Sequence, residues 1–188
     1  MSSYAIVVSK RLEWEERSMA KVKKTNVMRI LDKHKIMYDT KTYAYTEDDL
    51  SGIHAAAELG LDAARLFKTL VGKGNRTGIV VFCIPSDREL DLKKAAAVSG
   101  NKYVELLHVK DLPDITGYIR GGCSPIGMKK QFPTYINTSA ENFDTISISA
   151  GQRGQQVLLP ADSICAVTGA QIASLTLNHA DSTGGSIR

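Results

Sequence analysis

The chain has 188 residues, of which 43% are hydrophobic and 23% are charged, proportions that are ordinary for a soluble globular domain with a sizeable core. Its apolar runs are too short to span a bilayer or to form the centre of a signal peptide, so we expect a cytoplasmic protein without a membrane segment. The three cysteines are odd in number and scattered along the chain. They argue against a disulfide framework and favour free thiols.

Positive charge is concentrated at the N-terminal end of the sequence. Residues 1–35 contain nine lysines and arginines against four acids, whereas the rest of the chain contains fifteen against sixteen. Such a segment can attract a polyanion, or it can be a solubilising arm, and charge alone favours the arm. We expect residues 1–22 to be a basic, partly disordered extension, 23–177 to be one folded domain, and 178–188 to be a flexible tail.

The first predicted elements are a helix, a strand and a second, short helix. Apolar residues recur at helical spacing over 27–34, and Thr25 is a suitable N-cap. Aromatic and β-branched residues then favour a strand over 36–45. Ser51 is placed to cap an alanine-rich helix that Gly60 would end.

A hairpin of two nearly all-apolar strands comes next. The strand that contains Lys68 pairs with 77–85 across a turn at 72–76. Lys68 is the exception in this hairpin, because it stands between Leu66 and Leu70 on one face of its strand. A partly desolvated lysine must find a partner or lose its charge.

The remaining elements are short. The sequence predicts a helix over 92–99 between Asp91 and Gly100, a strand over 102–107, a helical turn over 110–117, strands over 134–137, 145–149 and 157–159, and a helix over 163–167 capped by Asp162. Strands outnumber helices, and the helices fall between them irregularly. This pattern predicts an α+β domain whose mixed sheet is curved or barrel-like and surrounded by helices.

Several familiar catalytic motifs are absent from the sequence. The glycines of 72–78 do not match a phosphate loop, and 121–127 lacks the second glycine of a nucleophile elbow. The four histidines are too scattered to form a metal site with the cysteines, so we expect neither a metal nor another cofactor. No paired carboxylates and no Ser-His-Asp arrangement can be assembled from the spacing.

Two glycine-rich loops remain as candidate sites. They are "RGGCSPIG" at 120–127 and "SAGQRG" at 149–154. Glycines let a backbone approach a ligand closely and point its N–H groups at an anion, although each loop alone would more often be a plain tight turn. Together with Lys68, the two loops indicate a ligand that carries phosphate or carboxyl oxygens.

Five short motifs also carry a family resemblance. "FKTLV", "LDLKKAA", "TGYIRGGCSPIG", "INTSA" and "SAGQRG" occur in this order between about residues 25 and 175. In order and spacing they resemble the YbaK family of aminoacyl-tRNA deacylases, and most closely its branch that acts on cysteine attached to proline tRNA. The position that varies within the family's glycine motif is Cys123 here.

The resemblance implies a trans-editing enzyme that removes cysteine from mischarged Cys-tRNA(Pro) and works beside prolyl-tRNA synthetase. Such an enzyme is needed because the synthetase pocket cannot strongly reject cysteine, which is nearly the size of proline. It implies that Lys68 is the catalytic residue. The substrate-binding residues that it implies, all from the quoted motifs except the matching tyrosine Tyr43, are Tyr43, Thr69, Gly121, Gly122, Cys123, Ser124, Pro125, Ser149, Gly151 and Arg153. The oligomeric state is left open.

The same resemblance implies a mechanism in which the cysteinyl thiol of the substrate attacks its own ester. An enzyme of this kind positions its substrate rather than attacking it, and backbone N–H groups over 121–124 could hold the developing oxyanion. Two alternatives stay open. The chain could hydrolyse another small aminoacyl ester, such as that of Ala-tRNA(Pro), or it could be a non-catalytic module that binds tRNA or a synthetase.

Overall fold

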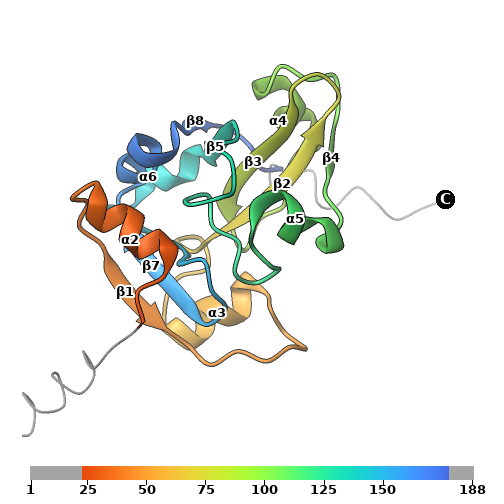
Figure 1. Ribbon diagram of the computed structural model, residues 1–188. Helices are drawn as coiled ribbons and strands as arrows, with labels where there is room; N and C mark the ends of the chain where they lie inside the picture. Colours follow the sequence, from red (N-terminus) through yellow and green to blue (C-terminus); the bar gives the residue numbers. More distant parts are fainter. Residues whose placement is uncertain (1–22, 178–188) are drawn as a thin grey trace, which may run out of the picture.

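The computed structural model describes residues 23–177, so the predicted extension 1–22 and tail 178–188 lie outside the described residues. The described part is an α+β fold in which helices surround two β-sheets (Figure 1), and the predicted fold class is confirmed. Its helical elements are α2 (Asn26–Lys33), α3 (Gly52–Leu59), α4 (Leu92–Val98), α5 (Leu112–Thr116), α6 (Ala161–Thr168) and the 3-10 turns η1 (Val109–Asp111) and η2 (Thr138–Asn142).

The larger sheet is mixed and has the strand order β4-β2-β3-β5-β8. Its strands are β2 (Phe67–Gly74), β3 (Gly78–Pro85), β4 (Val104–Leu106), β5 (Thr134–Asn137) and β8 (Gln171–Ala173). The pairs β4–β2 and β2–β3 are antiparallel, whereas β3–β5 and β5–β8 are parallel. The smaller sheet, of order β1-β7-β6, is antiparallel and consists of β1 (Asp39–Thr42), β6 (Ile146–Ser149) and β7 (Gln155–Leu159).

The two sheets do not close into a barrel within residues 23–177, which corrects the barrel-like part of the prediction. They meet at one isolated bridge, between Leu66 and Ser147, where the Ser147 N–H donates to the Arg65 carbonyl oxygen at 2.9 Å. A single bridge cannot continue the hydrogen-bonded ladder of one sheet into the other. The edge of β2 beyond this bridge is therefore left open.

The hairpin β2–β3 is apolar on both faces because each face is covered by a separate part of the core. Val80, Phe82 and Ile84 pack with α4, whereas Cys83 belongs to the larger cluster that also includes α2, β6 and β7. Residues alternate between the faces of a strand, so a strand buried on both sides reads as a continuous hydrophobic run.

The local predictions hold best where a cap or a turn defines the element. Thr25, Ser51 and Asp91 accept backbone N–H groups at the starts of α2, α3 and α4, and Gly60 ends α3 with a left-handed conformation (φ 62°).

Four details of the prediction are corrected. The strand expected over 36–45 is limited to β1, and the turn expected at 72–76 is shorter because β2 continues to Gly74. The last helix, expected over 163–167 with Asp162 as its cap, begins at Ala161 with Pro160 at the N-cap position. The strand β8 is not among the predicted elements. A strand of three residues, such as β8, carries almost no periodic signal and forms because β5 offers it a parallel edge.

Candidate active site

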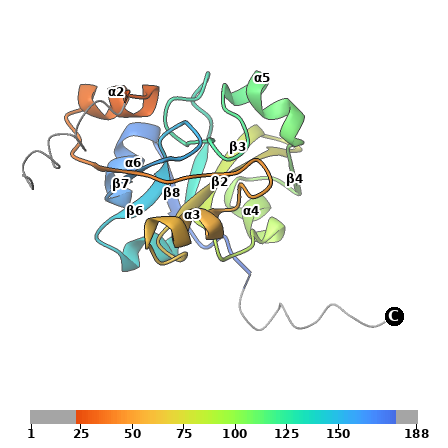
Figure 2. The ribbon, with the colours of Figure 1, turned by 90° about the horizontal axis from the view of Figure 1, so that it is seen from below.

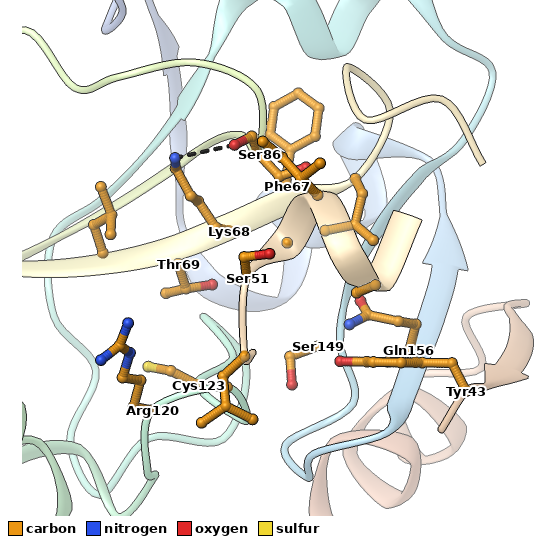
Figure 3. Close-up of a pocket in the computed structure, with 17 residues that line it drawn as sticks. Tyr43, Ser51, Phe67, Lys68, Thr69, Ser86, Arg120, Cys123, Ser149 and Gln156 are labelled. Carbon is orange, nitrogen blue, oxygen red and sulfur yellow. Dashed lines mark hydrogen bonds between the residues drawn. The ribbon is translucent and has the colours of Figure 1, made fainter. Parts of the chain in front are cut away.

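A cavity of about 410 Å³ lies against the open edge of β2. Figure 3 shows Thr69, Cys123, Ser149 and Tyr43 around this hollow, with Lys68 turned toward Ser86. The lining comes from the start of α3, from β2, from the loop after α5 and from the strands of the smaller sheet. The lining residues are Tyr43, Leu50, Ser51, Gly52, Ile53, Ala55, Leu66, Phe67, Lys68, Thr69, Leu70, Ser86, Arg120, Gly121, Cys123, Ser149 and Gln156.

The open edge explains why residues from both faces of β2 reach the cavity. On this side β4 pairs with Gly72–Gly74 only. The Val71 carbonyl oxygen accepts from the N–H of Leu107 at 2.9 Å, and the Arg65 carbonyl oxygen accepts from β6 in the same direction. Backbone groups alternate in direction along a strand, so those of Thr69 point to the same edge, between the two neighbouring strands. Thr69 therefore presents its N–H and C=O groups toward the cavity.

Lys68 is half-buried in the wall of the cavity. Its Nζ donates to the Ser86 carbonyl oxygen at 3.2 Å, which leaves further N–H donors of the ammonium group for a ligand. Burial lowers the pKa of Lys68, and the nearby carboxylates Asp87 and Glu89 oppose this effect only in part. Leu66 and Leu70 line the same cavity as Lys68. The lysine that interrupts this apolar stretch of sequence therefore lies in the wall of a pocket.

Several polar side chains in the cavity are held in place by hydrogen bonds. Ser51 Oγ accepts from the His54 N–H at 3.1 Å, and Ser149 Oγ accepts from the Gly151 N–H at 3.2 Å. Gln156 Oε1 accepts from a neighbouring hydroxyl of β6 at 3.2 Å. No histidine or carboxylate is among the described residues that line the cavity, so these hydroxyls have no adjacent general base of the usual kind.

Cys123 lies in the cavity wall, and its thiol is held in the neutral form. Burial raises the pKa of Cys123 to about 12, and a hydrogen bond with the Thr116 side chain lowers it only slightly by comparison. A nucleophilic cysteine needs a depressed pKa, because the thiolate is the reactive species. The environment of Cys123 is the opposite of the one that activates a thiol.

Six of the predicted site residues line the cavity, namely Tyr43, Lys68, Thr69, Gly121, Cys123 and Ser149. The structure brings these six together from four separate segments of the chain. Gly121 has a left-handed backbone (φ 83°), and a Cβ there would lie 3.3 Å from Leu50 and 3.4 Å from Arg153. The glycine is therefore needed both for the turn and for close packing.

The other five predicted residues, Gly122, Ser124, Pro125, Gly151 and Arg153, are not among the residues that line the cavity. The Gly122 N–H already donates to the Ile119 carbonyl oxygen at 3.0 Å, so it is not available as an oxyanion donor. Ser124 and Pro125 are buried, and a Cβ on Gly151 would lie 3.0 Å from the ring of Tyr118. Their assignment to substrate binding, like that of Arg153, stays a prediction.

Arg153 joins two loops that border the cavity. Its Nε donates to the Arg120 carbonyl oxygen at 2.9 Å, and its Nη1 donates to Glu47 Oε1 at 2.6 Å. Arg120 and the residues that follow Glu47 both belong to the cavity wall. Arg153 thus contacts the site through its neighbours.

Sequence reasoning missed four polar residues of the cavity, namely Ser51, Ser86, Arg120 and Gln156. Ser51 is predicted only as a helix cap, and Arg120 is the first residue of the glycine loop 120–127 but is given no role in the prediction. Ser86 directly follows β3, two positions after Ile84, which is the partner of Lys68 in the hairpin. Gln156 gives no signal in the sequence, because it reaches the cavity only through the pairing of β7 with β6.

Metal chemistry finds no support in residues 23–177. The described residues contain no group of three or more His, Cys, Asp or Glu side chains placed to hold a metal ion. Among the same residues, no helix is both long and apolar enough to span a membrane.

Comparison with known families agrees with the motifs and the fold. The family model described as the aminoacyl-tRNA editing domain matches residues 50–164. A protein of Enterococcus faecalis, EbsC, named as a candidate Cys-tRNA(Pro)/Cys-tRNA(Cys) deacylase, is 53% identical over 161 residues, which cover 84% of this chain and 98% of that protein. The chain belongs to the aminoacyl-tRNA editing domain family, and the resemblance to YbaK-type proteins is confirmed.

More distant matches include one further sequence and several solved structures of the same fold. An uncharacterized protein of Bacillus subtilis, YwhH, is 26% identical over 105 residues, covering 56% of this chain and 66% of that protein. The solved structure of a candidate trans-editing enzyme for prolyl-tRNA synthetase superposes with a TM-score of 0.69 at 20% identity, covering 82% of this chain and 99% of the other. A solved hypothetical protein gives a TM-score of 0.74 at 19% identity, with 81% and 100% covered.

Proposed function

We propose that this protein is a trans-editing deacylase that removes cysteine from mischarged Cys-tRNA(Pro). The observation that carries the proposal is the composition of the cavity, where a half-buried lysine and fixed hydroxyl groups meet without a histidine or a carboxylate among the described lining residues. The 53% identity to EbsC, named as a candidate deacylase for cysteinyl-tRNA, supports the same substrate. A volume of about 410 Å³ is within the range of small-molecule pockets.

The chemistry that suits such a cavity takes its nucleophile from the substrate. The cysteinyl sulfur attacks the carbonyl carbon of its own ester, a C–S bond forms, and the C–O bond to the terminal ribose breaks. The proton of the thiol ends on the ribose oxygen, and cysteine leaves as a cyclic thiolactone. The protein has to fold the cysteinyl group into this reactive geometry and stabilise the charge that develops.

Two groups on β2 are placed to stabilise that charge. The Thr69 N–H at the open strand edge is a donor for the carbonyl oxygen as it becomes negative. Lys68 is a cation beside it, suited to the ribose oxygen that leaves or to the phosphate of the terminal adenosine. This assignment moves the oxyanion donor from the glycine loop, where the Gly122 N–H is already bonded, to β2.

We further propose that prolyl-tRNA synthetase is the partner that supplies tRNA selectivity. The cavity is built for the aminoacyl end of the substrate, which different tRNAs share. The name of one structural relative, a candidate trans-editing enzyme for prolyl-tRNA synthetase, agrees with this pairing. Purified protein alone should therefore discriminate between aminoacyl groups more strongly than between tRNAs.

The test is release of free tRNA from matched substrates that carry cysteine, alanine or serine on proline tRNA. Rapid release from the cysteinyl ester alone is expected. Equal or faster release from the alanyl ester would favour water attack on a small aminoacyl ester and overturn the thiol mechanism. Binding without release from any of the three would identify a non-catalytic tRNA-binding module.

A further inference from the structure

A basic surface lies beside the catalytic cavity, and Asp32 is the one acid of the helix that contributes to it. It consists of the exposed ridge of α2 and the end of the segment between α5 and β5, and its cations are Arg29, Lys33 and Lys130, which we call the α2 ridge. We propose that the α2 ridge binds the phosphate backbone of the acceptor stem of the tRNA substrate. This inference rests on the deacylase function proposed above and assigns the part of the site that lies outside the cavity.

The ridge follows from the way α2 is packed. Val27, Met28 and Leu31 are buried against the core, so Arg29 and Lys33, one helical turn apart, lie on the opposite side and are exposed. Within residues 23–177 neither side chain forms an ion pair or a hydrogen bond. The one acid of the helix, Asp32, is already bound by Lys24 at 2.6 Å and by Tyr38 at 3.0 Å.

Lys130 lies across a groove from the same helix. The groove has a volume of about 160 Å³, and Ile30 of α2 and His34, which caps the end of α2, line it together with Lys130. No aspartate or glutamate is among its described lining residues, which are Ile30, His34, Pro125, Ile126, Gly127, Met128, Lys130, Gln131, Phe132, Thr134, Val167 and Thr168. Lys130 is the lysine or arginine that lines this groove, and Arg29 and Lys33 lie exposed on the helix that borders it. Clustered cations of this kind attract a polyanion.

One loop connects the groove to the cavity. Cys123 lines the cavity and Lys130 lines the groove, and the two are seven positions apart in the sequence. A fully extended chain of that length reaches about 25 Å, so Lys130 lies within roughly seven base pairs of the cavity along a duplex. Figure 2 shows α2, this loop and α5 along one border of the molecule, and Figure 1 shows them in the same order.

The charges favour a nucleic acid duplex as the occupant of this surface. Phosphate contacts made by lysine and arginine fix the position of a nucleic acid without reading its sequence, and that property suits a surface which only has to bring the aminoacyl end to the cavity. The sequence before α2 is also basic, because residues 1–25 contain six lysines and arginines against three acids.

The experiment compares two triple variants that lose the same charge. The first is Arg29→Gln with Lys33→Gln and Lys130→Gln. The control is Lys73→Gln with Arg76→Gln and Lys102→Gln, three exposed cations around the tip of the β2–β3 hairpin, at the end of the molecule away from α2 (Figure 1). Circular dichroism and thermal unfolding verify that both variants fold.

Two readouts are taken for each variant. Binding of uncharged proline tRNA is titrated at several salt concentrations, which requires no catalysis. Deacylation is measured on the full mischarged tRNA and on a cysteinylated trinucleotide that is too short to reach the ridge. The α2 variant should bind tRNA about tenfold more weakly at low salt and lose about 2 units of salt slope, since each lost phosphate contact removes somewhat less than one.

On the full tRNA the α2 variant should show a raised KM with kcat little changed, whereas the trinucleotide should react as with the wild type. The inference is overturned if the α2 variant binds tRNA like the control, or if it loses as much activity on the trinucleotide as on the tRNA. Unchanged tRNA binding with lost binding to prolyl-tRNA synthetase would assign the ridge to a protein partner and also overturn it. Failure of the wild type to deacylate any substrate would instead count against the proposed function, because tRNA binding is measured separately.

Discussion

Arg153 and Glu47, 106 positions apart in the sequence, form an ion pair with 2.6 Å between Nη1 and Oε1. The same guanidinium also donates from Nε to the Arg120 carbonyl oxygen. A planar guanidinium can hold two acceptors in a fixed relative geometry, which a lysine ammonium cannot. The pair therefore fixes the distance between the loop before α3 and the glycine loop, and both border the cavity.

Replacing Arg153 by alanine should raise the KM for aminoacyl-tRNA, because the two loops lose their common anchor. Glu47 is 72% exposed, so the ion pair itself adds little stability, and the total loss of unfolding free energy should be about 1 kcal/mol. Steady-state kinetics and denaturant unfolding measure both quantities. Arg153→Lys is the matched control: it keeps the positive charge, but its KM should stay raised. A KM restored to the wild-type value by lysine would show that charge alone matters.

Lys68→Met should lower deacylation by about 10²-fold or more, the scale of removing one preorganised electrostatic group. Methionine keeps much of the side-chain volume, so folding should be preserved. The measurement is single-turnover release of cysteine, accompanied by thermal unfolding. Normal turnover, or a variant that fails to fold, would contradict a catalytic role for Lys68.

The pH dependence of stability should report the burial of Lys68. Its pKa in the folded protein is lowered from the ordinary value of 10.5, so over the interval between the two values the unfolded chain holds a proton that the folded chain has lost. The free energy of unfolding contributed by Lys68 therefore rises with pH through this interval. Wild type should gain stability relative to Lys68→Met when unfolding is compared at about pH 7.5 and about pH 10. A difference that is constant, or that falls with pH, would argue against a desolvated lysine.

Cys123→Ser should keep most of the deacylase activity. The pKa of the Cys123 thiol is raised to about 12 by burial, so the thiolate needed for nucleophilic attack is scarce near neutral pH. Replacing the thiol of the substrate by a hydroxyl, as in seryl-tRNA, should nearly abolish release. Loss of activity in Cys123→Ser together with normal release of serine would assign the nucleophile to the protein instead.

Deleting residues 1–18 should weaken tRNA association at low salt without changing the preference for cysteine. The deleted segment lies outside the described residues, and its predicted contribution rests on charge alone. Exposed charges are screened as ionic strength rises, so the effect should shrink with added salt. Identical salt dependence with and without the segment would return it to the role of a solubilising arm.

Much of the fold could be predicted because its signals are local. The caps at Thr25, Ser51 and Asp91, the apolar hairpin, and the glycine that ends α3 all depend on neighbours within a few residues. The family resemblance extended the prediction to six residues of the cavity wall. The short strand β8 escaped prediction because its formation depends on a partner strand.

What the sequence by itself determined is the residue types of the site: a lysine within an apolar strand, two glycine loops, and the absence of a familiar catalytic triad. Only the tertiary structure decided which backbone groups are free to act. It occupies the Gly122 N–H with the Ile119 carbonyl oxygen and leaves the edge of β2 open at Thr69. The reason is physical, because hydrogen-bond availability depends on which strands and loops pack together. In this chain such partners can lie far apart in the sequence, as Arg153 and Glu47 do at a separation of 106 positions.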